Sequence, residues 1–324
     1  MSLPTHLFQP IESDLTTVED RLELLGEEAG PTLGPILTGV LLAPGKRLRP
    51  ALTLTCGQLF KPSTLGLKTM AAAVECLHTA TLIHDDVMDE PGERRGEPAL
   101  YRQAGNAIAL LIGDYLFAQA ALIASETNNL RIMRLFADAV AKVCKGQIEE
   151  FSRDQEARMW LTREDYYRTI DAKTGALFVL ACESGAVLGE ASLAAADALR
   201  EYGRSLGLAF QIVDDVLDLI GDEALLGKPA GSDLRQGVAT LPIIYLRDEI
   251  PETTLRAAFG QDGPREQAIE EIRYQARSGK GIEAAYQEAR HWADDAAARL
   301  DGLPRGTFRD LLRELTIGLV DRQT

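Results

Sequence analysis

The sequence has few cysteines, a shortage of positive charge and no long hydrophobic run, and each absence excludes a class of protein. The four cysteines, at positions 56, 76, 144 and 182, are too far apart for a zinc site and too few for a disulfide scaffold. They predict a reducing, cytoplasmic location. The 49 acidic residues outnumber the 34 basic ones, which gives a formal net charge of −15. We expect no nucleic-acid partner, because binding nucleic acid needs a basic face.

The sequence also lacks the patterns that are typical of membrane spans and of β-strands. No apolar run reaches the ~18 residues that a membrane span needs, and the N-terminus lacks the pattern of a signal peptide. Segments in which β-branched or aromatic residues alternate with polar ones are missing, so we expect no sheet in the core. These absences predict a soluble protein without a parallel α/β core.

The sequence does contain apolar residues at a spacing of three and four along most of its length. Ala71, Val74, Leu77 and Ala80 are one such series, and this spacing is the period of an α-helix. The pattern predicts an all-α fold. Helices are expected over residues 12–27, 31–42, 48–60, 65–90, 106–126, 129–153, 163–187 and 193–220, followed by shorter helices to the end.

Two acidic clusters share the pattern D-D-x-x-D, and each ends an apolar helix before a polar loop. They consist of Asp85, Asp86 and Asp89, and of Asp214, Asp215 and Asp218. On a helix the first and last aspartates lie about 40° apart and roughly 6 Å from each other, whereas the second points about 100° away. Such carboxylates repel, and Mg²⁺ suits them because it takes one or two carboxylates and keeps positions for phosphate. A solvated acidic helix end is the alternative for a single copy, and the presence of two copies favours the metal.

Basic residues are concentrated in two places in this acidic chain. The run Gly45–Pro50 contains Lys46 and Arg49 at the start of a predicted helix, and the forked donors of Arg with the point charge of Lys suit diphosphate oxygens. Arg94 and Arg95 follow Asp89 in the next loop. A solvated basic face for the first group and a surface ion-pair cluster for the second remain the alternatives.

Five segments in order resemble the trans-polyprenyl diphosphate synthases. Residues Glu75–Gly96 resemble the first aspartate-rich region of that family, and Phe210–Asp218, with Gly227–Pro229 and Ser232–Arg235, resembles the second region and its loop. Lys173-Thr174 lies between them and Gly45–Pro50 before them, so the resemblance covers residues 40–245. It implies a homodimer and a single-domain helical bundle of the isoprenoid synthase type, residues 1–324, with a large central cavity and a loose segment at residues 1–10.

The resemblance implies a head-to-tail 1′-4 condensation of isopentenyl diphosphate with an allylic prenyl diphosphate. Two or three Mg²⁺ ions are expected, with at most peripheral membrane contact when the product leaves. The implied metal ligands are Asp85, Asp86, Asp89, Asp214 and Asp218. The implied catalytic residues are Arg94, Lys173, Thr174 and Gln211. The implied diphosphate-binding residues are Lys46, Arg49, His78, Arg94, Arg95, Lys173 and Lys228.

The sequence departs from the family pattern at two places. Val238 stands where the family loop often has a diphosphate-binding lysine, so Lys173 and Lys228 are expected to carry more of that role. The segment Gly146–Glu150 exchanges the polar residues of a family pattern without removing them. Neither departure predicts a loss of function.

Small residues behind the first cluster bear on the length of the product. Ala80, Thr81, Cys76, Ala73 and Ala72 lie on the predicted helix that precedes Asp85. Without a bulky aromatic near position 80, they would leave a groove of about 12 Å for a product longer than fifteen carbons. The alternative is that the small residues only let two helices pack closely.

Two other functions compete with this interpretation. A terpene cyclase shares the all-α fold and one D-D-x-x-D, but it needs no isopentenyl diphosphate site such as Lys46, Arg49 and Arg95. A non-catalytic subunit should have lost aspartates or Lys173. The segment Gly113–Phe117 is the expected contact of the homodimer.

Overall fold

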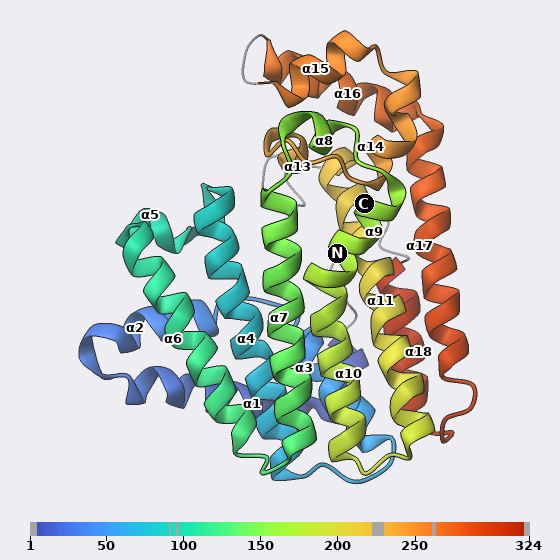
Figure 1. Cartoon of the computed structure of the whole chain (residues 1–324). Coiled ribbons are helices and arrows are strands. Elements are labelled where there is room, and N and C mark those ends of the chain that lie inside the picture. The colour runs from blue at the N-terminus through green and yellow to red at the C-terminus, as the bar shows by residue number, and fades with distance from the viewer. Residues whose placement is uncertain (1–4, 91, 95–96, 222–229, 261–263, 321–324) are drawn as a thin grey trace.

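The predicted all-α fold is confirmed. The structure, a computed structural model, describes residues 5–90, 92–94, 97–221, 230–260 and 264–320 (Figure 1). Most of the predicted helices agree with the structure to within two residues at either end. The long helices that run side by side in the main bundle are α3 (Leu48–Gln58), α4 (Leu65–Asp89), α6 (Asn106–Ser125), α7 (Leu130–Phe151), α10 (Ala176–Leu188), α11 (Leu193–Ile220) and α18 (Thr307–Val320).

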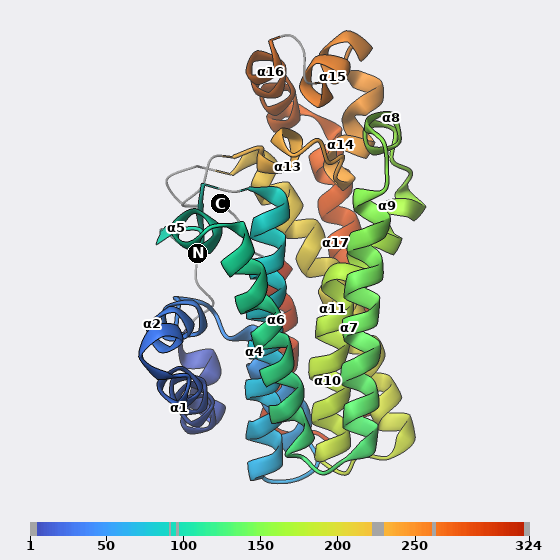
Figure 2. The ribbon, with the colours of Figure 1, turned by 60° about the vertical axis from the view of Figure 1, so that its left-hand side comes forward.

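The N-terminal region packs against this bundle. The 3₁₀-helix η1 (Thr5–Ile11) leads into α1 (Glu12–Glu28) and α2 (Gly30–Leu41), which lie together at one side (Figure 2). Leu7 and Ile11 are buried in the main core. The expectation of a loose segment over residues 1–10 is therefore wrong for residues 5–10, because these apolar side chains fix the segment to the core.

The predicted helix over residues 163–187 is interrupted in the structure. α9 (Arg163–Ile170) passes into a π-helical turn, η2 (Asp171–Gly175), before α10 begins. Arg204 of α11 donates a hydrogen bond of 2.7 Å to the Asp171 carboxylate in this turn. π-turns within α-helices often lie at functional sites, and this one contains Lys173 and Thr174.

A second group of helices begins at the upper end of the molecule in Figure 1, and α17 runs down from there beside the main bundle. It consists of α8 (Gln155–Met159), α13 (Ser232–Arg235), α14 (Leu241–Leu246), η3 (Arg247–Glu249), α15 (Glu252–Phe259), α16 (Arg265–Ser278) and α17 (Lys280–Arg299). The expectation of only shorter helices at the C-terminal end is wrong for α17, which has 20 residues and packs along α11. α11 contributes to the cores of both parts, with Leu206 in one and Ile212 in the other. A single domain remains a prediction that this shared helix supports.

A small hairpin lies in the polar segment after α4. β1 (Glu93–Arg94) and β2 (Glu97–Pro98) pair antiparallel, and α5 (Leu100–Ala104) follows. The strands have two residues each, so the core contains no sheet among the described residues.

α6 packs closely along α4. At Gly113 an added Cβ would lie 2.5 Å from the His84 ring, so only glycine allows this contact.

Within the described residues, α6 is also the one helix whose length and composition suit a membrane span, with a mean hydropathy of 1.9 and 39% of its span buried. Asp114 and Gln119 interrupt its apolar residues, so α6 is not an uninterrupted apolar run of the kind considered in the sequence. One such helix is weak evidence of a span, because a soluble core helix passes the same test.

Candidate active site

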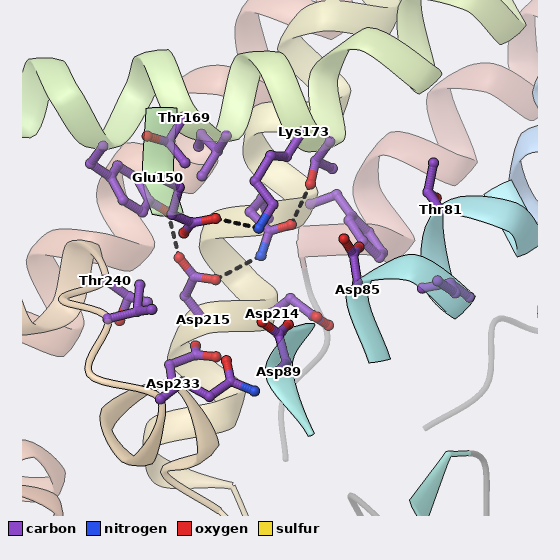
Figure 3. Close-up of a pocket in the computed structure, with 18 of the residues that line it drawn as sticks. Thr81, Asp85, Asp89, Glu150, Thr169, Lys173, Asp214, Asp215, Asp233 and Thr240 are labelled. Atoms are coloured by element: carbon purple, nitrogen blue, oxygen red, sulfur yellow. Dashed lines mark hydrogen bonds and ion pairs between the residues drawn. The ribbon is translucent and has the colours of Figure 1, made fainter. Parts of the chain in front are cut away.

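A cavity of about 870 Å³ opens between α4, α7, α10 and α11 (Figure 3). Residues 233–240, which follow the second acidic cluster, close one side. The predicted site residues that line this cavity are Arg49, His78, Thr81, Asp85, Asp89, Arg94, Lys173, Thr174, Gln211 and Asp214. The fold therefore brings together residues that are far apart in the sequence.

In the first cluster, Asp85 and Asp89 line the cavity, as the helical spacing predicts. Burial raises the pKa of Asp85 to about 6, although the charges of Lys173 and Arg94 lower it in part. The pKa of Asp89 is raised for the same reason. Carboxylates whose ionised form is disfavoured in this way bind a cation readily, because the cation restores the electrostatic stabilisation lost with water.

The middle aspartate of that cluster has a different position. Asp86 is 4% exposed and accepts hydrogen bonds from Arg94, one of them 2.8 Å long from Nε. Asp86 does not line the main cavity, but with Arg94 it lines a second, more apolar cavity of about 620 Å³ on the neighbouring face of α4. Burial lowers the pKa of Arg94, but the hydrogen bond and charge of Asp86 outweigh this, so the pKa is raised overall.

The second cluster has a different arrangement. Asp214 and Asp215 line the cavity, whereas Asp218 does not. Asp218 is buried, and its two oxygens accept hydrogen bonds of 2.6 Å from the Ser232 hydroxyl and 3.1 Å from the Asp233 backbone amide. The carboxylate of Asp218 thus holds the start of α13 and does not line the cavity.

Asp215 accepts hydrogen bonds from both sides within the cavity wall. Tyr166 donates through its hydroxyl at 2.6 Å and Gln211 through Nε2 at 2.7 Å, while Thr174 donates to Gln211 Oε1 at 2.6 Å (Figure 3). Burial raises the pKa of Asp215 to about 7, although both hydrogen bonds lower it in part. Tyr166 was not predicted, and nothing in the local sequence pattern marks it.

Lys173 has a carboxylate partner that was also missed. Its ammonium group pairs with Glu150 of α7, which lines the same cavity (Figure 3). Burial lowers the pKa of Lys173, but Glu150 and Asp85 outweigh this effect and raise it overall. The sequence did offer one signal for Glu150. It lies in the segment Gly146–Glu150, where the polar residues of a family pattern are exchanged but retained.

The basic run at the start of α3 has two connections to α4. Arg49 Nη1 lies 3.0 Å from His78 Nε2, and the guanidinium lies 5.1 Å from the Phe178 ring centre. Arg47, in a left-handed conformation with φ 46°, forms a buried ion pair of 3.0 Å with Glu75. Lys46 is exposed and does not line either cavity. Arg95 and Lys228 lie outside the described residues.

The sequence and the structure both match known proteins. The family model described as polyprenyl synthetase matches residues 31–275. The chain belongs to this family. Component 2 of the heptaprenyl diphosphate synthase of Geobacillus stearothermophilus is 36% identical over 315 residues, which cover 96% of each chain. The octaprenyl diphosphate synthase of Haemophilus influenzae is 32% identical over 295 residues, covering 90% of this chain and 89% of the relative.

A solved structure gives the same result for the fold. The polyprenyl synthase of Caulobacter crescentus, solved with calcium and isoprenyl diphosphate, superposes with a TM-score of 0.90 at 34% identity, covering 98% of this chain and 97% of that one. These matches confirm the predicted enzyme class. This polyprenyl synthetase is a prenyltransferase.

The small residues behind the first cluster of the polyprenyl synthetase are buried where α4 packs against α6. Ala80 and Cys76 have 0% exposure and line neither cavity, and the same burial holds for Ala73 and Ala72. The Cys76 thiol donates to the Leu116 carbonyl of α6 at 3.5 Å. Close packing of α4 and α6 accounts for these small side chains, as in the alternative interpretation of the sequence, and the groove at Ala80 and Cys76 stays a prediction. Thr81 does line the main cavity.

The donor set fits a metal that is shared with the substrate. Asp85, Asp89 and Asp214 line one cavity, but the described residues contain no group of three or more carboxylate, histidine or cysteine side chains close enough to hold an ion alone. Mg²⁺ is commonly bound by one or two carboxylates and completed by water and substrate phosphate. The polyprenyl synthetase therefore has carboxylates suited to metal-bound diphosphate and not to a closed protein site.

Proposed function

We propose that the chain catalyses the Mg²⁺-dependent head-to-tail 1′-4 condensation of isopentenyl diphosphate with an allylic prenyl diphosphate. The observation that carries this proposal is the position of three carboxylates and three basic side chains around one cavity. These residues are Asp85, Asp89, Asp214, Arg49, Arg94 and Lys173. The carboxylates suit metal ions, and the basic groups suit two diphosphates.

The departing diphosphate accumulates negative charge when the allylic substrate ionises. Mg²⁺ bound by Asp85, Asp89 and Asp214 would supply Lewis-acid stabilisation of that charge. Lys173 of η2 and Arg94 of β1 both add positive charge to the cavity, and nearby carboxylates raise their pKa values overall against the effect of burial. Charges that are fixed before the reaction stabilise the transition state at little reorganisation cost.

The second substrate needs its own diphosphate site and a fixed orientation. Arg49 Nη1 of α3 and His78 Nε2 of α4 lie 3.0 Å apart, and both residues line the cavity. We assign them to isopentenyl diphosphate. Lys46 and Arg95 remain candidates from the sequence resemblance, since Lys46 lines neither cavity and Arg95 lies outside the described residues. Holding both substrates in this way converts an encounter of two molecules into a positioned reaction.

The growing chain extends from the allylic carbon toward the apolar part of the cavity wall. Thr81, Leu177 and Phe210 belong to this part. We expect Thr81→Phe to shorten the products, because a bulky ring at this position occupies the cavity. Ala80→Phe is the matched comparison and should lower the thermal stability, because overpacking of a helix contact costs about 1–3 kcal/mol. Chromatography of the products of both variants, with melting curves, tests this assignment.

A homodimer is part of the proposal and is supported by the surface of α6. Leu111 and Leu122 are 62% and 58% exposed on this helix, and Ile108 and Leu110 are also exposed. An apolar face of this kind marks an interaction site. Leu111→Glu should convert a dimer into a monomer in light scattering after gel filtration. A wild-type protein that is monomeric at micromolar concentration would contradict this part.

The direct test is elongation by the purified protein. Labelled isopentenyl diphosphate is incubated with allylic primers of increasing length, with Mg²⁺ or with a chelator. We expect Mg²⁺-dependent products longer than fifteen carbons. Cyclic products from an allylic diphosphate alone would indicate a terpene cyclase, and no elongation with any primer would overturn the proposal. A cytoplasmic location is also proposed, in keeping with four unpaired cysteines.

A further inference from the structure

Three hydrogen bonds connect Tyr166, Asp215, Gln211 and Thr174 in the cavity wall, and two of them are donated to Asp215. The Tyr166 hydroxyl donates to Asp215 Oδ2 at 2.6 Å, and Gln211 Nε2 donates to Asp215 Oδ1 at 2.7 Å. Thr174 Oγ1 donates to Gln211 Oε1 at 2.6 Å. Each of these four residues comes from a different part of the chain or a different helical turn, and all four line the main cavity.

The order of donors along this series is fixed by chemistry. Gln211 Nε2 faces Asp215 and Gln211 Oε1 faces Thr174, and an amide oxygen can only accept a hydrogen bond. The Thr174 hydroxyl then has to donate to Gln211, which leaves its lone pairs as the part of the group available to the cavity. A hydroxyl that presents lone pairs stabilises a cation, whereas one that presents its proton does not.

Among the four hydrogen-bonded residues, Tyr166 is the least exposed. It is 3% exposed and packs in the second core beside α11, so its hydroxyl position is set by the core. Without that donor, Asp215 would lose one of its two partners and the amide of Gln211 could turn. The orientation of the Thr174 hydroxyl therefore depends on a residue that is not its neighbour.

We propose that Tyr166 is a positioning residue for the prenyl transfer, which acts through Asp215 and Gln211 to keep the lone pairs of Thr174 toward the allylic cation. The inference rests on the proposed function. Tyr166 does not act on the diphosphate groups, since those are assigned to Lys173, Arg94, Arg49 and His78. Its loss should therefore lower kcat and leave the KM of isopentenyl diphosphate unchanged.

The test compares Tyr166→Phe with Tyr167→Phe. Tyr167 is the next residue on α9, and its hydroxyl also donates to a carboxylate, Glu288, at 2.9 Å, but it does not line the cavity. We expect kcat to fall about tenfold in Tyr166→Phe and to stay within about twofold in Tyr167→Phe, because hydrogen bonds to charged groups are stronger than most. Melting curves of both variants show whether either has lost its fold.

A double-mutant cycle separates positioning from general damage. Thr174→Val removes the hydroxyl at the end of the series, so Tyr166→Phe should lower kcat little further in that background. Independent losses in the double variant, or an unchanged kcat in Tyr166→Phe, would overturn the proposal. If wild-type protein elongates no primer at all, the proposed function fails instead, and the two failures are distinguishable.

Discussion

The two D-D-x-x-D clusters have the same pattern but different positions around the cavity. In the first, the first and last aspartates, Asp85 and Asp89, line the cavity and the middle one pairs with Arg94. In the second, the first two line it and the last, Asp218, is held by Ser232 and the backbone of Asp233. The comparison shows that neighbouring donors, and not helical spacing alone, decide which carboxylates reach a substrate.

The clusters also differ in their nearby positive charge. Lys173 and Arg94 both lower the pKa of Asp85, which burial raises. On the opposite side, Val238 lines the cavity at the position where the sequence resemblance led us to expect a lysine. We therefore expect the first cluster to be the stronger metal site, and the following predictions test this difference in order of expected effect.

Removing one carboxylate from each cluster should give the largest effect. We expect Asp85→Asn to lower kcat about 10³-fold and Asp214→Asn about 10²-fold, because each loses a charge that stabilises the departing diphosphate through metal. Steady-state kinetics at saturating Mg²⁺ measure both. Asp138→Asn, an exposed position on α7, is the control. Equal losses in the two variants would contradict the unequal roles.

Asp218 should affect stability more than catalysis. Asp218→Ala removes the acceptor of the Ser232 hydroxyl and the Asp233 amide, so we expect the free energy of unfolding to fall by about 1–3 kcal/mol. Urea denaturation measures the loss, and Ser232→Ala should reproduce part of it. If Asp218→Ala keeps full stability but abolishes Mg²⁺-dependent activity, Asp218 is a metal ligand after all.

The raised pKa of Asp85 predicts a pH-dependent difference in stability. The ordinary pKa of an aspartate is 3.8 and burial raises the pKa of Asp85 to about 6, so the folded state binds this proton more tightly than the unfolded state. The contribution of this proton to stability is present below about pH 4 and is lost as the pH rises through about 6. In chelator, the stability of the wild type should therefore fall relative to Asp85→Asn between pH 4 and 7. A difference that is independent of pH would show that Asp85 titrates normally.

Adding a cation beside the second cluster should give the smallest effect. Val238→Lys places a positive charge in the cavity, and we expect the KM of the allylic diphosphate to fall by at most about fivefold, because a partly exposed ion pair contributes about 1 kcal/mol or less. Val238→Met has similar bulk without charge and should leave this KM unchanged. If this KM falls equally in both variants, the cause is apolar contact and not the added charge.

Much of this protein could be predicted from short-range patterns. The three- and four-residue spacing of apolar side chains placed most helices, and the two acidic clusters with Lys173 and Arg49 marked the cavity. Each of these signals lies within a few helical turns. The sequence could not predict Glu150 beside Lys173 or Tyr166 beside Asp215, because those pairs join separate helices.

The sequence by itself thus determined the helical fold, the family and the side chains available for diphosphate and metal. Only the tertiary structure decided how each side chain is used. Ala80 and Cys76 became a helix contact because α6 packs against them, and Asp86 and Asp218 turned away from the cavity because Arg94 and Ser232 offered hydrogen bonds. Buried polar groups are held by their nearest partners, and those partners are known only when the chain is folded.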